Sequence, residues 1–205
     1  MRRVVFILGV LLLASLLPVV ARADTIQVTN HFGVAIITNA GIETSGSELW
    51  NFNGIQAGHG HSLGRVIFST GALISGSIWT GGTFSSVGSS FKMIGVGSAG
   101  QPKGTIFNGA FEGPISWTLE SFANHIHAYD LTGTIVGQLW NGHVVTGTTT
   151  QTIYTYWSQE RVDHQGNIHL GVTKLTPTPE PGTLGLLGTG LVAIAGALRR
   201  KLFRS

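Results

Sequence analysis

The chain has 205 residues, including 30 Gly, 6 Pro and no Cys, and only 10% of its residues are charged. This length allows one domain of ordinary size together with targeting tails. The low charged fraction argues against a charged disordered protein and against a helical bundle, whose solvent-facing sides need Glu, Lys and Arg. The absence of Cys rules out disulfides, thiolate metal sites and a cysteine nucleophile.

The net charge of +3 comes from the two ends of the chain. Seven of the twelve Lys and Arg residues lie within the first 22 or the last seven residues. Residues 24–178 carry five basic and eight acidic side chains, which leaves this segment with a net charge of −3. The basic patch typical of a nucleic-acid-binding domain is therefore missing, and we expect no nucleic-acid partner.

Residues 1–23 have the three parts of a secretory signal peptide. Arg2 and Arg3 supply the positive charge, residues 4–17 form a leucine-rich apolar run, and Ala21-Arg22-Ala23 has the small-x-small pattern of a cleavage site. The apolar run of about 14 residues is shorter than the roughly 20 residues of a membrane-spanning helix. We therefore predict cleavage before Asp24, with an uncleaved N-terminal anchor as the alternative.

The C-terminal segment reads as a linker, an apolar helix and a basic tail. Residues 176–181 are rich in proline, which favours an extended chain. Residues 182–198 carry no charge, and as a helix they would reach about 26 Å, enough for a thin bilayer core. The basic residues that follow favour a cytoplasmic location for residues 199–205. We predict a transmembrane helix over 182–198, with a buried core helix as the alternative.

This C-terminal pattern resembles the PEP-CTERM sorting signal of exported bacterial proteins. The resemblance rests on Pro179-Glu180-Pro181, on the apolar segment after it, and on the cluster Arg199, Arg200 and Lys201. It implies recognition by an exosortase-type membrane transpeptidase, which would cut near the Pro-Glu-Pro triplet. The protein would be anchored in the cytoplasmic membrane before processing, and afterwards would lie at the cell envelope surface or outside the cell. Tails of this kind are also labelled "ice-binding protein C-terminal" domains, but the label implies no ice binding here.

Residues 24–175 show the pattern of an exported all-β domain. Short runs alternate apolar with polar residues and are separated by Gly, Asn and Ser, as strands and turns require. Strands are expected around residues 26–28, 64–69, 72–80, 91–94, 115–120, 129–135, 145–158 and 168–172. The sequence predicts a single antiparallel β-sandwich or barrel-like domain, flanked by an N-terminal signal helix and the C-terminal transmembrane helix.

Connections in this domain are predicted from Gly and Asn. The pairs Asn108-Gly109 and Asn141-Gly142 and the triplet Thr80-Gly81-Gly82 favour tight hairpin turns. The Gly-rich stretch 95–100 favours a hairpin connection rather than a nucleotide-binding loop. Residues 39–62, rich in Gly, Asn, His and Ser, are expected to form a long surface loop or a pair of loops.

Two histidine pairs have the spacing of possible metal ligands. His59 with His61, and His125 with His127, would each share one face of a strand with the imidazoles about 6.5–7 Å apart. A complete zinc or copper site needs a third ligand, such as His143, His164, His169, Asp130 or Asp163, and no linear spacing supplies one. In the simpler interpretation His125 and His127 cap an apolar face, and the other pair is solvated. We therefore expect no cofactor.

The chain carries no recognisable catalytic motif. It has no Gly-x-Ser-x-Gly, no His-Glu-x-x-His and no phosphate-binding loop before a helix. A glycoside hydrolase needs two carboxylates about 5–10 Å apart. Glu112 and Glu120 border the strand of Trp117, whereas Asp130, Glu160 and Asp163 lie elsewhere in the sequence. We expect a protein that is not an enzyme, with a hydrolase as the weaker alternative.

Carbohydrate binding is the specific activity that the aromatic residues favour. Candidates for stacking on sugar rings are Trp50, Phe52, Trp79, Tyr154, Tyr156 and Trp157, although most aromatics of a β-domain belong to its core. Because Tyr154 and Tyr156 alternate with Ile153 and Trp157 on a strand, one of the two faces points outward. We predict a ligand surface at Tyr154 and Tyr156.

Taken together, these patterns predict an exported cell-surface or extracellular-matrix protein that an exosortase processes. Its expected role is structural or adhesive, alongside secreted polysaccharide. A secreted module that binds carbohydrate or metal is the alternative.

Overall fold

The computed structural model describes residues 25–98, 100–123, 125–156 and 165–178, with the isolated positions 190 and 194. The side chain of Tyr156 is not described. The predicted signal peptide, its cleavage site at Ala21, Ala23 and Asp24, and nearly all of the predicted 182–198 helix lie outside these residues. Within the described part of the chain, no helix is long and apolar enough to span a membrane.

The described residues form thirteen strands. These are β1 (Ile26–His31), β2 (Gly33–Thr38), β3 (Gly41–Thr44), β4 (Ser47–Phe52), β5 (Ile55–Gln56), β6 (Gly64–Ser69), β7 (Leu73–Ser77), β8 (Gly81–Phe84), β9 (Ser90–Val96), β10 (Lys103–Ala123), β11 (Ile126–Leu139), β12 (Val144–Tyr156) and β13 (Gln165–Pro177). Every pairing between them is antiparallel.

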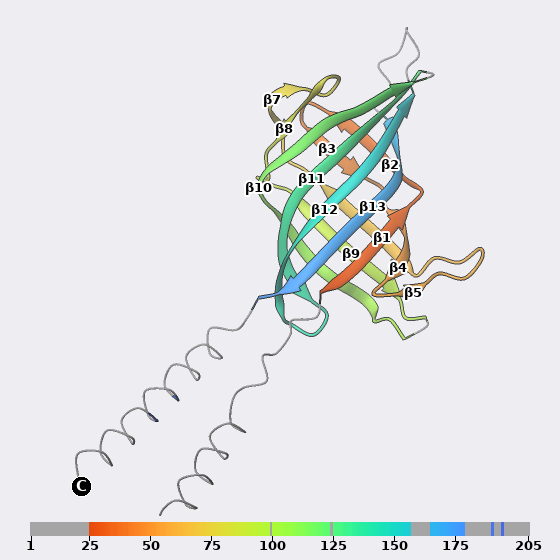
Figure 1. Cartoon of the computed structure of the whole chain (residues 1–205), viewed down its shortest axis with the longest axis vertical. Coiled ribbons are helices and arrows are strands. Elements are labelled where there is room, and N and C mark those ends of the chain that lie inside the picture. Colours follow the sequence, from red (N-terminus) through yellow and green to blue (C-terminus); the bar gives the residue numbers. More distant parts are fainter. Residues whose placement is uncertain are drawn as a thin grey trace, which may run out of the picture.

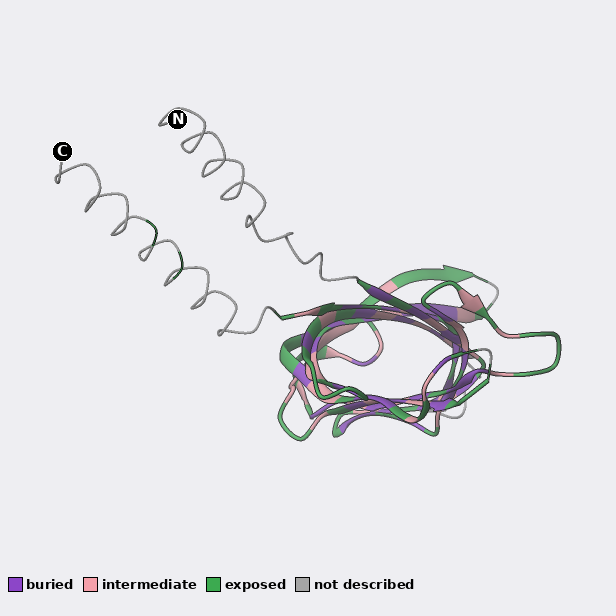
Figure 2. Cartoon of the chain, turned by 90° about the horizontal axis from the view of Figure 1, so that it is seen from below, coloured by how far each residue is buried: buried purple, intermediate pink, exposed green. Residues whose placement is uncertain are grey.

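The strands close into a barrel with eight positions around its wall (Figure 1). β1 and β2 together form one interrupted strand, and both pair with β13. β3 and β4 together form a second interrupted strand, in which β3 pairs with β2 and β4 pairs with β1. The wall continues through β6, β9, β10, β11 and β12 to β13, which pairs with β1 and closes the ring. Seen along its axis, the barrel is a closed, flattened ring (Figure 2). Because wall neighbours follow one another in sequence, the topology is up-and-down.

Alternation determines which side chains face the interior. In β10, Ile115 and Trp117 are buried while Ser116 and Thr118 between them are exposed. In β11, Leu131 and the other apolar residues at alternate positions are buried in the same way. The all-β prediction is confirmed, and of its two architectures, sandwich or barrel, the structure is the barrel.

The prediction of a surface loop over residues 39–62 is wrong for half of the stretch, which forms β3, β4 and the short β5. Residues 57–62 form a connection between strands, as predicted. Ile42, Leu49 and Phe52 are buried in the barrel core, with polar residues between them. The many Gly, Asn and Ser residues of this stretch hid the alternation. One of them, Gly46, forms a kink between β3 and β4, where its φ is 113°.

Asn108-Gly109 is not a turn either, because it lies in the middle of β10. Gly109 is paired with Gly137 of β11. A Cβ at Gly109 would lie 2.2 Å from the carbonyl oxygen of Val136 and 2.7 Å from Cζ of Phe107. Glycine is present at this position because two strands and an aromatic ring approach closely. The turn predicted at Asn141-Gly142 is confirmed between β11 and β12.

An aromatic cluster fills the centre of the barrel. Phe91 stacks on Phe68 with ring centroids 5.8 Å apart, and its ring meets that of Phe111 edge-on at 5.7 Å. These side chains come from β6, β9 and β10, which are neighbours in the wall. Edge-to-face and stacked contacts of this kind add to the stabilisation from buried apolar area.

A hydrogen-bonded polar layer lies beside this cluster, on the wall formed by β12, β13, β1 and β4. The buried amide of Asn30 donates to Ser47 Oγ at 2.6 Å and to Gln151 Oε1 at 2.9 Å. Gln151 Nε2 donates to Thr149 Oγ1 at 2.9 Å, and this hydroxyl shares a hydrogen bond with Thr173. The linked partners offset the desolvation of these buried polar groups.

Candidate functional site

The two ends of the barrel differ in what covers them. We call the end where β1 begins and β13 finishes the terminal rim; the β9–β10 and β11–β12 turns also lie there (Figure 1). The opposite end, with the β2–β3 and β10–β11 turns, is the distal rim. The hairpin of β7 and β8 also lies at the distal rim and pairs with the second half of β10.

Two aromatic side chains fasten the distal hairpin over the core. Trp117 Nε1 donates to the carbonyl oxygen of Ile78 at 2.9 Å, and Tyr129 Oη donates to that of Trp79 at 2.8 Å. The rings of Trp117 and Tyr129 stack with centroids 4.4 Å apart and an interplanar angle of 9°. The turn between β7 and β8 is thereby held against the core, and Ile78 is itself buried.

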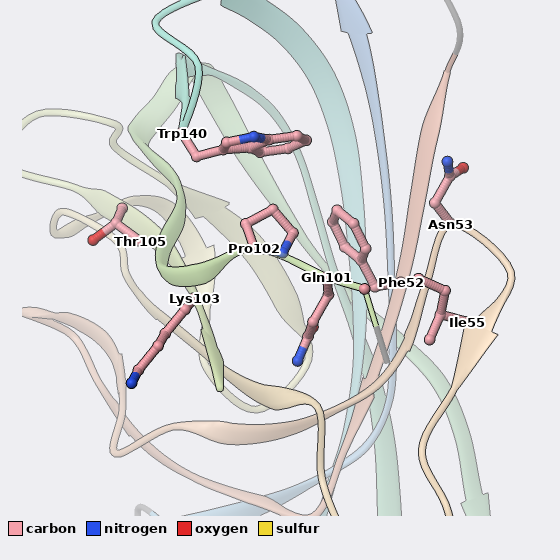
Figure 3. Close-up of a pocket in the computed structure, with 9 residues that line it drawn as sticks. Phe52, Asn53, Ile55, Gln101, Pro102, Lys103, Thr105 and Trp140 are labelled. Atoms are coloured by element: carbon pink, nitrogen blue, oxygen red, sulfur yellow. The ribbon is translucent and has the colours of Figure 1, made fainter. Parts of the chain in front are cut away.

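The terminal rim carries an open groove of about 760 Å³, which we call the rim groove (Figure 3). Its walls come from the end of β4, the β9–β10 turn and the β11–β12 turn. The lining residues are Phe52, Asn53, Ile55, Gly100, Gln101, Pro102, Lys103, Thr105 and Trp140. A concave surface with aromatic side chains and a few polar groups is the usual form of a small-ligand site.

Trp140 is the most prominent side chain of the rim groove. Its backbone N–H donates to the carbonyl oxygen of Ile106 at 2.9 Å, and the tight turn at Asn141-Gly142 follows directly. Trp140 is 47% exposed, and its indole meets the buried ring of Phe52 edge-on at a centroid distance of 6.1 Å. In Figure 3 the indole lies over Pro102 and Phe52 as a roof to the groove.

Gln101 forms part of the inner wall and retains an unused acceptor. The residue is only 5% exposed, and its Nε2 donates to the carbonyl oxygen of Leu63. Its Oε1 has no hydrogen-bond partner among the described residues. Buried side-chain oxygens normally have a donor, so this buried oxygen is an exception among the described residues.

Lys103 is the charged side chain of the rim groove. It lies exposed at the start of β10, and no Asp, Glu or His is among the lining residues given above. Asn53, in the turn after β4, lies on the opposite side of the groove from Lys103 and Thr105 (Figure 3). The groove therefore offers a cation, an amide and a hydroxyl around an aromatic roof.

The predicted ligand residue Tyr154 lies elsewhere, on the outer wall of the barrel. Ile153 faces the core, and the half-buried Tyr154 stacks on His169 of β13 with centroids 4.4 Å apart. His31 Nδ1 donates to the carbonyl oxygen of His169 at 2.8 Å, and its ring meets Trp50 edge-on at 5.9 Å. Tyr154 thus belongs to a row of rings across β12, β13, β1 and β4. The ligand surface predicted at Tyr154 and Tyr156 stays a prediction.

The histidine pairs lie at opposite ends of the barrel. His59 and His61 are exposed in the segment between β5 and β6, at the terminal rim. His125 is exposed in the turn before β11 with a φ of 64°, so it does not share a strand face with the buried His127. Among the described residues, which leave out Asp163 and His164, no three His, Asp or Glu lie close enough to hold a metal ion.

His127 is part of a column of rings beneath the distal rim. Its imidazole stacks on Phe122 with centroids 4.3 Å apart and, on its other side, lies 6.0 Å from Tyr129. Burial lowers the pKa of His127 because the charged imidazolium is desolvated. Burial also raises the pKa of the Tyr129 phenol.

Of the acidic residues considered for hydrolysis, the three that the structure describes are not among the lining residues of the rim groove. Glu112 and Glu120 are exposed along β10. Asp130 lies on the outer face, where its Oδ1 accepts a hydrogen bond from Thr152 Oγ1 at 2.7 Å. Glu160 and Asp163 lie outside the described residues.

Sequence reasoning named Phe52 but missed the other residues of the rim groove. Trp140 had one usable signal: a large aromatic directly before an Asn-Gly turn lies at a hairpin end, where the core cannot cover it fully. Gln101 and Lys103 gave no comparable signal. They reach the groove because β6 pairs with both β4 and β9, which brings the β9–β10 turn to the same rim as the end of β4.

One comparison with known families gives a match, in the C-terminal segment. Residues 177–201 match the model of the PEP-CTERM protein-sorting motif, a stretch that contains Pro179, Glu180, Pro181, Arg199, Arg200 and Lys201. The resemblance seen in the sequence is confirmed, and the motif indicates exosortase-dependent sorting of an exported protein. No curated protein and no solved structure gives a significant match.

The matched motif begins within the barrel. Pro177, its first residue, is the last residue of β13 and is paired with Val145 of β12. Thr178 N donates to the carbonyl oxygen of Val144 at 3.1 Å. The sorting motif therefore leaves the barrel at the terminal rim. Its contact there, Val144, is the first residue of β12 and follows Trp140 by four residues in the sequence.

Proposed function

We propose that the protein is a non-enzymatic component of the cell envelope surface or extracellular matrix, where its barrel has a structural or adhesive role alongside secreted polysaccharide. In this proposal an exosortase-type enzyme processes the chain near Pro179-Glu180-Pro181. Before processing, the segment 182–198 anchors it in the cytoplasmic membrane.

The observation that carries this proposal is the direct continuity of barrel and sorting motif. Because the motif starts at Pro177, the last residue of β13, no separate domain lies between the barrel and the processing site. Cutting near the triplet would release or transfer the barrel as a complete closed unit. The lining of the rim groove, with neither carboxylate nor imidazole, favours binding over hydrolysis.

The intact mass of the protein from native envelope and culture medium tests the processing step. We expect the mass of a chain that begins at Asp24 and ends near Pro181, plus the mass of any attached glycan. The variant Glu180→Ala should keep residues 182–205 and stay with the membrane fraction, whereas Glu112→Ala, on the outside of the barrel, should be processed normally. A wild-type mass that still contains residues 182–205 would contradict the processing step.

A strain that makes no extracellular polysaccharide tests the proposed role. We expect the processed protein to move from the cell-associated fraction into the medium in that strain, with its mass unchanged. An unchanged distribution would contradict an adhesive role while leaving the processing intact.

A further inference from the structure

We propose that the rim groove binds an acidic saccharide, a segment of a uronate-containing chain, with one sugar ring stacked against Trp140. This inference rests on the proposed function and deepens it by naming a site and a ligand class. Three features of the groove carry it: its aromatic roof, its single positive charge and its polar side walls.

The aromatic roof fits the apolar face of a pyranose ring. Trp140 exposes nearly half of its surface even though Phe52 contacts it from the core side. Pro102 lies below the indole in Figure 3, so apolar groups form the roof of the groove and part of its wall. Flat rings with an apolar body are suited to stacking on other flat, partly apolar groups, and they order few rotatable bonds on binding.

The charge of the groove selects an anionic sugar over a neutral one. Lys103 is the charged residue of the lining, although the segment 24–178 as a whole has a net charge of −3. A cation placed in a groove on an otherwise acidic domain attracts a carboxylate locally. Because Lys103 is exposed, salt should weaken this contribution.

The side walls provide hydrogen-bonding groups for sugar hydroxyls. Asn53 and Thr105 lie exposed on opposite sides of the groove, and both can donate and accept hydrogen bonds. Few polar groups around an aromatic surface match the general pattern of sites that orient a polar ligand.

Titration of the purified full-length protein with defined oligosaccharides tests the inference. The probes are an alginate tetrasaccharide, which carries carboxylates, and cellotetraose, which is neutral, with tryptophan fluorescence and calorimetry as readouts. We expect the acidic probe to bind at least tenfold more tightly than the neutral one. Trp140→Ala should weaken binding at least tenfold, and Lys103→Gln should remove most of the preference for the acidic probe and most of its salt dependence.

Matched variants away from the groove separate the site from the rest of the surface. Trp50→Ala removes an aromatic ring from the outer wall, and Lys174→Gln removes a charge from the exposed face of β13; both should bind as the wild type does. Absence of binding by both probes, or full affinity in Trp140→Ala, would overturn the proposed site. Equal affinity for the two probes would overturn the acidic ligand class.

Failure here is distinguishable from failure of the proposed function. If neither probe binds but the processed protein still leaves the cells when polysaccharide is missing, the rim groove is the wrong site and the adhesive role stands. If the probe binds but the distribution of the protein does not depend on polysaccharide, the adhesive role is wrong and the saccharide site stands.

Discussion

The two ends of the barrel carry the same kind of side chain in opposite roles. At the distal rim, Trp117 is buried and holds a hairpin over the core through its N–H. At the terminal rim, Trp140 is half exposed above an open groove. The difference follows from the inserted segment between β6 and β9, whose hairpin covers one end and leaves the other uncovered. In this fold an insertion on one side determines which end is available for a ligand.

Replacing each of these two tryptophans by alanine should give the largest difference in stability between the two ends of the barrel. We expect Trp117→Ala to lower the free energy of unfolding by about 3–5 kcal/mol, since a large buried ring and the anchor to Ile78 are lost together. Trp140→Ala should lower it by about 1 kcal/mol or less because the indole is half exposed. Denaturant unfolding followed by circular dichroism measures both. Equal losses would show that the two ends do not differ in this way.

The polar layer between the two ends gives the next largest expected effect. Asn30→Leu should lower the free energy of unfolding by about 1–3 kcal/mol, because Gln151 and Ser47 lose a buried partner. The double variant Asn30→Leu, Gln151→Leu should be less destabilised than the sum of the two single variants. Strict additivity in such a double-mutant cycle would mean that the two amides are not energetically linked.

Removing the hydroxyl oxygen of Tyr129 should weaken the attachment of the distal hairpin to the core. Tyr129→Phe keeps the stack on Trp117 but loses the hydrogen bond to the carbonyl oxygen of Trp79, so we expect a loss of about 0.5–1.5 kcal/mol. Tyr154→Phe, on the outer wall, is the matched control and should change stability by roughly 0.5 kcal/mol or less. If both substitutions have the same effect, the hydroxyl of Tyr129 does not fasten the hairpin.

Acidification gives the smallest expected effect and also acts at the distal end. Because burial lowers the pKa of His127, the unfolded chain binds a proton more readily than the folded one. The contribution of His127 is fully present above its unfolded pKa of about 6.5 and is lost as the pH falls from there toward the folded pKa. Unfolding curves for His127→Gln should show a shallower loss between pH 7 and 5 than the wild type. The exposed control His61→Gln should keep the wild-type slope.

Local patterns were sufficient to predict several of the strands, but not β3, β4 and β5, and not how the strands are arranged. The alternation around Trp117 and Leu131 is visible in the sequence because the positions on both sides of each residue are polar. The closure of the ring is not visible, since it depends on β1 meeting β13 across nearly the whole domain. A sandwich and a barrel have the same alternation, so the sequence left both open.

The same limit applied to the candidate site. The sorting motif was predictable because its parts follow one another in the chain. The rim groove was not predictable, because Asn53, Lys103 and Trp140 lie at or next to the ends of three different strands. The emphasis on Tyr154 came from its place on a strand, whereas the groove is built at strand ends.

The pairing of β1 with β13 has a consequence for how the barrel is completed. In a chain that crosses a membrane from its N-terminus, β1 emerges first. One edge of β1 stays unpaired until residues 165–177 have also crossed. Until then the sheet is an open meander with two unpaired edges, which can pair with other chains. The segment that seals the barrel is followed at once by the sorting motif, from Pro177 onward. Any chain long enough to be recognised for sorting already contains the strand that it needs to close.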